Sequence, residues 1–332
     1  MTNAVLEISN LRVAFKSNRS SVTALRDVSF SLHAGKTMAL VGESGSGKSV
    51  TSLAIMGLLP RNGSVTGGSI RYRKRDGQVA DLTTTAESDM RKLRGAEIAM
   101  IFQEPMSSLN PLFTIGDQIG EMLLLHQPLN ASARRKRVLE MLELVEIPAA
   151  ASRFDSYPHE LSGGMRQRVM IAIAMVCNPS LLIADEPTTA LDVTIQAQIL
   201  DLMKRLQSEL GMSILFITHD MGVVAEMADE VAVMYAGAVV EQAPVKELFA
   251  STRHPYTQGL LASIPVPGRK EGELLVPISG TVPPLHAMPP GCAFAPRCKY
   301  SDKDCEVPVE LTEPSQNHRV ACVKASEVIQ HG

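Results

Sequence analysis

The sequence has no tryptophan, and only 4% of its 332 residues are aromatic. Long hydrophobic runs are also missing, because the longest strongly apolar stretch, residues 169–177, falls far short of the ~20 residues that a helix needs to cross a bilayer. The first residues lack the basic and apolar segments of a secretory signal. These absences predict a chain that stays in the cytoplasm and associates with a membrane only through partner proteins.

An excess of one charge is absent as well. The chain carries 32 Lys and Arg against 35 Asp and Glu, a formal net charge of −3, so its composition gives no sign of nucleic-acid binding. The short basic run at residues 134–137 is typical of a solvated helix face. A hydrophobic content of 45% supports a true core, and 332 residues can hold one large domain and a smaller one.

Residues 42–49 read G-E-S-G-S-G-K-S and fit the phosphate-binding pattern G-x-x-x-x-G-K-[ST]. An apolar strand is expected at residues 37–41 and a helix from Lys48 to about Gly57, which is the context that such a loop requires. Lys48 should reach the β- and γ-phosphates of ATP, and the Ser49 hydroxyl should ligate Mg²⁺. The residues expected to line the ATP phosphates are Gly42, Ser44, Gly45, Ser46, Gly47, Lys48, Ser49 and Val50.

A second apolar strand, residues 181–184, ends in the acidic pair Asp185-Glu186. Because it follows a phosphate loop in the same chain, this pair predicts catalytic carboxylates. Asp185 is placed to hold Mg²⁺ through water. Glu186 is placed to accept a proton from the attacking water, or to orient that water.

Two more polar side chains follow predicted strands. Gln103 comes after strand 98–102 and is expected to contact both Mg²⁺ and the lytic water. His219 comes after strand 213–217 and is expected to donate to the γ-phosphate. Phe15, on strand 5–15, is expected to stack on adenine, with a core strand aromatic as the alternative interpretation.

Ser162-Gly163-Gly164 stands at the start of a predicted helix, residues 165–176, and forms a second candidate anion site. One chain has one phosphate loop and one such signature. The simplest interpretation is that two such ATP-binding domains pair, and that the signature of each closes over the ATP bound to the other. Asp192 would then lie at the interface between the two domains.

The organisation of the chain predicts an α/β fold. Strands at residues 28–32, 180–184 and 231–235 alternate with helices such as 193–210, which indicates a parallel sheet with helices on both faces. Helical periodicity over residues 114–145 indicates an inserted helical subdomain, about residues 104–178. Residues 61–95 are expected to form a surface hairpin and a connector, with turns at Gly67-Gly68 and Asp76-Gly77.

The composition shifts near residue 263. The prolines that break any helical pattern beyond it are at positions 265, 267, 277, 283, 284, 289, 290 and 296. We therefore expect a nucleotide-binding domain at residues 1–263 and a small loop-rich C-terminal module at residues 264–332.

These motifs together resemble the ATP-binding subunits of bacterial peptide ABC importers, the dipeptide and oligopeptide permease group. The general cassette pattern covers roughly residues 5–250. Closer matches are Met100–Pro111, Ser162–Val169, Ala184–Gln198, the segment His254-Pro255-Tyr256-Thr257 and the cysteine-rich end. The resemblance implies an ABC-type P-loop ATPase core with a helical subdomain, plus a small loop-rich, Cys-containing C-terminal module.

The resemblance also implies partners and a location. ATP binding would close two cassettes head to tail and move two membrane permease subunits, and hydrolysis would reset them. The second cassette is expected to be a homologous, non-identical subunit. The segment after Gln103 would receive a short coupling helix of the permease. A solute-binding protein outside the membrane would deliver the solute, and the chain would lie on the cytoplasmic face of the bacterial inner membrane.

Four cysteines fall within the C-terminal module: Cys292, Cys298, Cys305 and Cys322. Stable disulfides are not expected in the cytoplasm, and the C-x-x-C pairs of structural zinc are absent. The wider spacing suits an iron–sulfur cluster, with zinc or reduced free thiols as the alternatives. The resemblance favours a [4Fe-4S] cluster with a structural or sensing role.

Other functions remain as alternatives. The first alternative is an importer of another solute, because related permeases carry glutathione, nickel or other small solutes. A soluble cassette ATPase acting on nucleic acid usually adds a second cassette, a coiled coil or C-x-x-C modules, which this sequence lacks. The presence of Glu186 argues against a module that binds ATP without hydrolysing it.

The sequence departs from the family at two positions. Met165 and Val50 stand where many cassettes have Gln and Thr, and neither change removes a catalytic group.

Overall fold

The computed structural model of the chain describes residues 3–16, 21–103, 108–189, 191–264 and 278–330. The chain divides into two compact units, and each is described by itself. Unit 1 comprises residues 1–6, 32–36 and 72–216, and unit 2 comprises residues 7–31, 37–71 and 217–332. Both units therefore combine segments that are far apart in the sequence, and each carries part of the predicted site.

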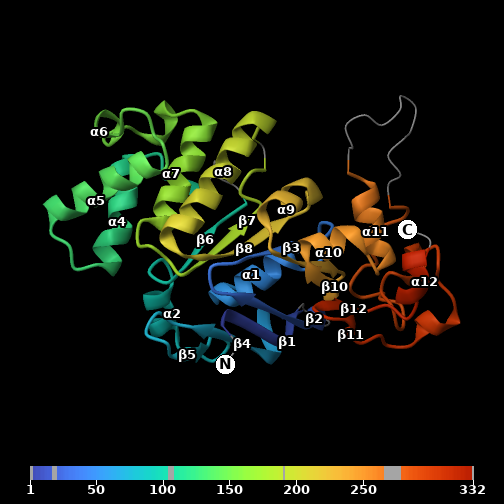
Figure 1. The fold of residues 1–332 in the computed structure, drawn as a ribbon. Helices are drawn as coiled ribbons and strands as arrows, with labels where there is room; N and C mark the ends of the chain where they lie inside the picture. Colours follow the sequence, from blue (N-terminus) through green and yellow to red (C-terminus); the bar gives the residue numbers. More distant parts are fainter. Residues whose placement is uncertain (1–2, 17–20, 104–107, 190, 265–277, 331–332) are drawn as a thin grey trace. The chain divides into compact units, whose positions relative to one another are not determined.

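Unit 1 combines short parallel strands with a set of helices (Figure 1). Its elements are β5 (Val79–Asp81), α2 (Glu87–Leu93), β6 (Ile98–Ile101), α4 (Ile115–His126), α5 (Ala131–Leu144), α6 (Ala150–Arg153), a 3₁₀ turn (Pro158–Glu160), α7 (Gly163–Met175), β7 (Leu181–Asp185), α8 (Val193–Leu210) and most of β8 (Ser213–Thr218). β6 and β7 run parallel, with Ile98 opposite Leu181 and Ile101 opposite Ala184. Their carboxyl ends therefore lie at the same edge, where Gln103 and Glu186 follow.

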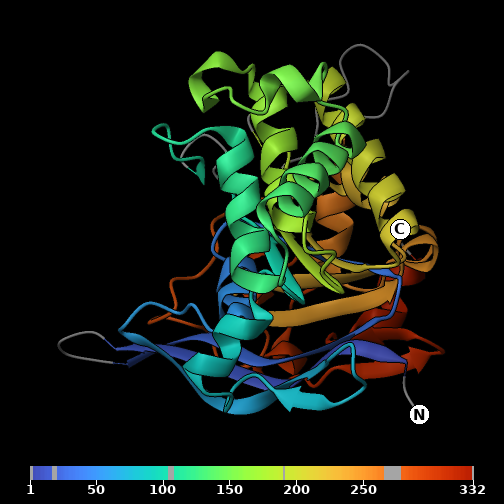
Figure 2. The same cartoon turned by 90° about the vertical axis from the view of Figure 1, so that its left-hand side faces the viewer.

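The helices of unit 1 form a subdomain in which α4 packs against α5 and α7 (Figure 2). Their buried faces carry apolar residues at helical spacing, such as Ile115, Ile119 and Leu123 on α4. Polar caps define where the helices begin. The Thr114 side chain accepts from the Asp117 N–H, and the Asn130 side chain accepts from the Ala133 N–H.

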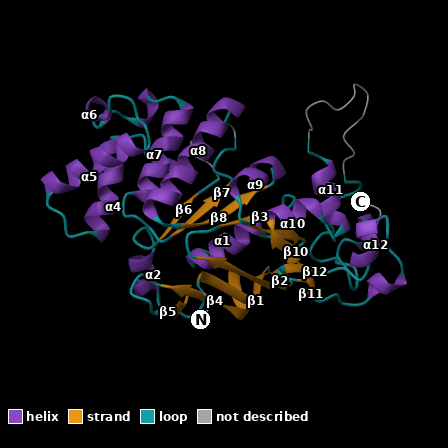
Figure 3. Ribbon diagram, in the orientation of Figure 1, coloured by secondary structure: helices purple, strands orange, loops and turns teal. Residues whose placement is uncertain are grey.

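Unit 2 carries the phosphate loop and the C-terminal part of the chain. Its elements are most of β1 (Ala4–Lys16), β2 (Ser21–His33) and β4 (Gly63–Arg73), then β3 (Thr37–Val41), α1 (Lys48–Met56), α9 (Met221–Met227), β9 (Glu230–Tyr235), β10 (Ala238–Pro244), α10 (Val245–Ala250), α11 (Pro255–Ala262), 3₁₀ turns (Ala295–Arg297 and Lys303–Glu306), β11 (Thr312–Ser315), β12 (His318–Val320) and α12 (Ala325–Gln330). Beyond residue 278 loops dominate (Figure 3).

The sheet of unit 2 continues from the ATPase core into the C-terminal part. β3 runs parallel to β9, and β9 pairs antiparallel with β10. β12 then pairs antiparallel with β10, with Val320 opposite Glu241, and β11 pairs with β12. A hydrophobic cluster joins the same segments, because Tyr235 of β9, Tyr256 of α11 and Phe294 pack together with ring centroids 4.7–5.4 Å apart. The C-terminal residues thus share a core with the strands beside the phosphate loop.

Most predicted elements are confirmed, including the phosphate-loop strand and helix and the helical stretch between residues 114 and 145. The predicted turn at Gly67-Gly68 is wrong, because β4 runs through it. Gly68 has φ +80° and lies against the Asn10 carbonyl, so glycine here permits a close approach of two backbones within a strand. Helix α2 was not predicted.

Some predictions concern residues outside the described ones. These residues are 104–107, which belong to the matching segment Met100–Pro111, residue 190, and the prolines at 265, 267 and 277. The boundary near residue 263 therefore stays a prediction. Within the described ranges, no helix combines the length and the apolar character that crossing a membrane requires.

Candidate active site

The phosphate loop of unit 2 joins the fully buried strand β3 to helix α1. Gly42, Gly45 and Gly47 have φ angles of +152°, +78° and +105°, which side chains rarely allow. A Cβ on Gly42 would clash with the Met234 carbonyl, and one on Gly47 would lie 2.7 Å from Leu25. The glycines of the pattern are therefore required by the loop's backbone and by its neighbours.

Lys48 and Ser46 are the polar side chains buried in this loop. The Lys48 ammonium donates to the carbonyls of Gly42 and Glu43, at 2.7 and 3.0 Å. Within the described part of the chain, the buried Ser46 hydroxyl has no hydrogen-bond partner. A buried polar group without a partner is costly, and a phosphate oxygen would satisfy it. The loop therefore fits the triphosphate that its sequence predicts.

Glu43, a variable position of the pattern, is held by residues from the C-terminal part of the chain. Its N–H donates to the Tyr256 hydroxyl at 2.8 Å. Its carboxylate accepts two hydrogen bonds from the Arg297 guanidinium, at 2.6 and 2.9 Å. The sequence analysis missed these contacts, since the pattern sets no residue type at this position and Arg297 lies 254 residues away.

The acidic pair of unit 1 lies at the end of β7. Asp185 is only 4% exposed, and Glu186 adopts a left-handed backbone with φ +47°. A non-glycine residue in this conformation carries strain of the kind found at functional sites. The Glu186 carboxylate accepts hydrogen bonds from the Gln103 amide and the Thr189 hydroxyl, both at 3.0 Å. The structure thus brings together Gln103 and Glu186, which lie 83 residues apart in the sequence.

A buried amide supports the turn that follows Glu186. Gln167 on α7 is fully buried, and its Nε2 donates to the carbonyl of Pro187. This residue was missed by the sequence analysis. Its signal was a polar side chain on the otherwise apolar buried face of the helix after Ser162.

The Ser162-Gly163-Gly164 segment opens α7 as predicted. The Ser162 hydroxyl accepts from the Met165 N–H at 3.4 Å, so residue 165 contributes its backbone to the cap. A Cβ on Gly164 would lie 3.0 Å from Ile195 in the first turn of α8, whose N-cap is Asp192. The signature and the segment of Asp192 are therefore neighbours within unit 1, and the space beside Gly163 is open.

Phe15 and His219 both lie in accessible positions. Phe15 on β1 is half-buried and is not part of the buried core. Its ring lies over Gly63 of β4, where a Cβ would come within 2.7 Å of it. His219 is exposed after β8, directly before Asp220, which caps α9. Part of the Phe15 ring is exposed, and its adenine contact stays a prediction.

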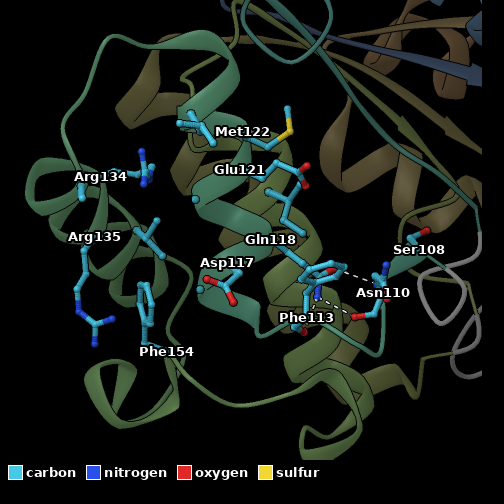
Figure 4. A pocket seen from close by; sticks show the side chains of 16 residues that line it. Ser108, Asn110, Phe113, Asp117, Gln118, Glu121, Met122, Arg134, Arg135 and Phe154 are labelled. Atoms are coloured by element: carbon cyan, nitrogen blue, oxygen red, sulfur yellow. Dashed lines mark hydrogen bonds between the residues drawn. The ribbon is translucent and has the colours of Figure 1, made fainter.

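A groove of about 830 Å³ lies on the helical subdomain, beyond Gln103 (Figure 4). The Gln118 side chain organises its edge, donating to the carbonyls of Asn110 and Phe113 and accepting from the Asn110 N–H. Two large apolar side chains of its lining are exposed, Phe113 at 54% and Leu124 at 61%. Exposed apolar surface of this kind marks sites of protein association.

The four late cysteines line one small cavity in unit 2, together with His254 and Phe294. All are free thiols. Burial raises the pKa of the Cys322 thiol to about 12 and also raises the pKa values of Cys292 and Cys298. The donor type and the shared cavity suit an iron–sulfur cluster. Their present positions do not, because the described residues contain no group of three or more Cys, His, Asp or Glu placed to hold a metal ion.

Comparisons with known proteins show which family the chain resembles. Residues 25–189 match the ABC transporter family, and residues 240–305 match the C-terminal region of oligopeptide/dipeptide transporters. The ATP-binding cassette MJ0796, solved as a dimer in a post-hydrolysis state bound to ADP and Pi, is 28% identical with a TM-score of 0.63. That match covers 72% of this chain and 98% of MJ0796.

Relatives of known name align along nearly the whole chain. A putative peptide import ATP-binding protein of Brucella ovis is 54% identical over 331 residues, or 98% of each chain. The dipeptide transport ATP-binding protein DppD of Bacillus subtilis is 50% identical over 329 residues, or 98% of this chain and 96% of its own. The chain therefore belongs to the family of ABC transporter ATP-binding proteins that carry the oligopeptide/dipeptide transporter C-terminal region.

Proposed function

We propose that this chain is the ATP-hydrolysing, energy-coupling subunit of a peptide importer. The observation that carries the proposal is the likeness to peptide import ATP-binding proteins, which extends over 98% of this chain. A protein that only binds ATP would not need the carboxylate of Glu186 beside Gln103.

Nucleotide binding is assigned to the phosphate loop and to Phe15. The loop N–H groups and the N-terminus of α1 attract the phosphate charge, and Lys48 adds a cation at the β- and γ-phosphates. Ser49, Asp185 and Gln103 would each supply an oxygen ligand of the type that Mg²⁺ prefers. Mg²⁺ at this position neutralises charge on the phosphate oxygens. Phe15 offers its accessible ring to the adenine.

Hydrolysis is assigned to Glu186, Gln103 and His219. Glu186 orients the attacking water or accepts its proton, and Gln103 holds that carboxylate in place. His219 donates to the γ-phosphate as negative charge develops there. These roles rest on the strand-end positions of the three side chains and on the hydrogen bond between Gln103 and Glu186.

Closure of two cassettes is assigned to the Ser162–Gly164 signature and Asp192. The helix N-terminus of α7 can accept the γ-phosphate of the ATP bound to a second cassette, since the space beside Gly163 is open. The dimeric form of the similar cassette MJ0796 supports this arrangement. A homologous subunit, rather than a second copy, is the proposed partner.

The groove on the helical subdomain is the proposed docking site for the permease. A short amphipathic helix from a membrane subunit would place apolar side chains against Phe113 and Leu124. Two permease subunits and an extracytoplasmic solute-binding protein complete the proposed importer. The chain would then be held at the cytoplasmic face of the inner membrane by the permease, and its solute would be a dipeptide or an oligopeptide.

The four late cysteines are the proposed ligands of a [4Fe-4S] cluster with a structural or sensing role. Support comes from the single cavity that all four thiols line. Iron and sulfide analysis of protein purified without oxygen, with the absorbance spectrum, tests it. About four iron atoms per chain are expected by the chemistry of such a cluster, and their loss in Cys298→Ser. Zinc alone, or no metal, would reject the cluster.

The proposed function is tested by purifying the tagged chain from its native membranes in mild detergent and identifying what accompanies it. Two multi-span permease subunits and a second cassette are expected, with MgATP hydrolysis that is lost in Lys48→Ala. Recovery alone, or with nucleic acid, would reject the importer role.

A further inference from the structure

We propose that Arg297 is a positioning residue for nucleotide binding, which tethers the phosphate loop to the C-terminal part of the chain through Glu43. The inference rests on the proposed ATPase function. It assigns a part of that site to a residue far outside the ATPase motifs.

The ion pair between Arg297 and Glu43 is bidentate and shielded from water. Nη1 lies 2.6 Å from Oε2 and Nη2 lies 2.9 Å from Oε1. The Arg297 side chain is 4% exposed and that of Glu43 is 29% exposed. Two parallel charge-assisted hydrogen bonds fix both the distance and the orientation of the partners. The hydrogen bonds from the guanidinium to Glu43 raise the pKa of Arg297 above its usual value.

Arg297 is itself fully anchored. A guanidinium has five N–H donors. Beyond its two bonds to Glu43, Arg297 donates to the carbonyls of Ser279 and Ile278 at 2.9 and 3.3 Å and to the Tyr235 hydroxyl at 3.3 Å. Each donor therefore has an acceptor, and three of the acceptors lie outside the phosphate loop. Because these acceptors hold Arg297 in place, Arg297 in turn fixes the position of the Glu43 carboxylate.

Glu43 is the point through which the tether acts on the loop. Its carbonyl accepts from the Lys48 ammonium at 3.0 Å and from the Ser46 N–H at 3.2 Å. Its N–H is fixed by Tyr256, whose ring is fully buried. A displacement of Glu43 thus shifts both the Lys48 ammonium and the backbone at Ser46.

The glycines of the phosphate loop give its backbone conformational freedom, which a tether would restrict. Three of its eight residues are glycines with positive φ, and glycine loses the most conformational freedom on ordering. Fixing Glu43 before the nucleotide arrives removes part of that entropy loss from the binding step. Preorganisation of this kind strengthens binding without adding a contact to the ligand.

The experiment compares Arg297→Ala, Glu43→Ala and the double variant, using full-length protein and a fluorescent ATP analogue with Mg²⁺. Each single change is expected to raise the dissociation constant about tenfold, equal to about 1.4 kcal/mol, and the double variant no more than either alone. KM for ATP should rise in parallel while kcat changes little. Arg297→Lys should restore affinity in part, since an ammonium cannot form the two-pronged pair.

Arg253→Ala is the matched control. Arg253 is also partly buried in unit 2 and bonds to Ser315, and its contact is with β11 rather than with the loop. This variant should lose some thermal stability and keep the wild-type dissociation constant. If Arg297→Ala does not fold, Glu43→Ala and Arg297→Lys still report on the tether.

The inference is overturned if folded Glu43→Ala and Arg297→Ala bind the analogue as the wild type does, or if their effects add. A fall in melting temperature with unchanged affinity would make the pair merely structural, which also overturns it. Failure of the wild type to bind or hydrolyse ATP would instead reject the proposed function.

Discussion

The Gln103 amide donates a hydrogen bond to the Glu186 carboxylate, with Nε2 and Oε2 3.0 Å apart. Both residues follow parallel strands of unit 1, β6 and β7, and therefore meet at the same edge. Thr189 donates to the same carboxylate oxygen. The orientation of the proposed catalytic carboxylate is thus held by two donors, Gln103 and Thr189.

Replacing Glu186 with Gln should stop hydrolysis and leave ATP binding intact. An amide cannot accept a proton from the attacking water, so turnover should fall about 100-fold or more. ATP that is bound and not hydrolysed should also hold the cassettes closed. Phosphate release, nucleotide binding and size-exclusion chromatography with the partner cassette measure the three effects.

Thr189→Val is the control for that substitution, because it removes one donor to Glu186 and leaves the carboxylate. It should reduce turnover about tenfold at most. Hydrolysis by Glu186→Gln at the wild-type rate would show that another group activates the water.

Exposed apolar residues of the groove should be needed for permease binding and not for folding. Phe113→Ser and Leu124→Ser remove apolar surface that is 54% and 61% exposed, so the melting temperature and the basal ATPase rate of the isolated subunit should stay close to wild type. Co-purification with the permease should be lost. Val79→Ser, at a site 55% exposed on β5, is the control and should retain the permease. Equal retention by all three variants would place the permease site elsewhere.

Glu241 should be a major stabilising residue of unit 2. Its side chain is fully buried, and its two oxygens accept from the backbone N–H groups of Arg253 and His254. Oε1 also lies 2.8 Å from His318 Nε2. Glu241→Ala leaves these polar groups buried without a partner and should cost about 3 kcal/mol of unfolding free energy. Denaturant unfolding measures the loss. Glu247→Ala, at a carboxylate 45% exposed and 3.7 Å from the same imidazole, should change stability little.

Acid should destabilise the protein through His254. Complete burial lowers its pKa from 6.5 to about 4. In the unfolded chain the imidazole takes up a proton below about pH 6.5, whereas in the folded chain it does so only below about pH 4. Stability from this group is therefore complete above pH 6.5 and falls between pH 6.5 and pH 4, by up to about 3 kcal/mol.

His254→Asn tests this assignment, because the His254 Nδ1 that accepts from the Tyr256 N–H can be replaced by the Asn oxygen at the cap of α11. The variant should show a flatter dependence of unfolding free energy on pH between 4 and 6.5. An unchanged slope would assign the acid sensitivity to other groups.

The local parts of the site could be predicted from the sequence. The loop from Gly42 to Ser49 and the strand ending at Asp185 are specified by neighbouring residues, so their position on strand ends and helix starts follows from periodicity and turn chemistry. The meeting of Gln103 with Glu186 also follows, once both are placed after parallel strands.

What could not be predicted depends on tertiary contacts. Arg297 reaches Glu43 across 254 residues, and His318 reaches Glu241 across 77 residues. Neither residue belongs to a sequence pattern, because a basic residue in a polar, proline-rich segment resembles a solvated one until the fold buries it. Helix α2 was missed for the opposite reason, since it is short and only Met90 and Leu93 are buried, too few for a clear helical period.

The most direct measurement of the central claim is ATP-driven uptake of a labelled dipeptide by proteoliposomes that contain this chain, its partner cassette, the two permease subunits and the binding protein. The importer account predicts uptake that requires MgATP on the side of the membrane where the cassettes lie. This uptake should disappear with Glu186→Gln. ATP hydrolysis by the assembled complex without any dipeptide uptake would contradict it.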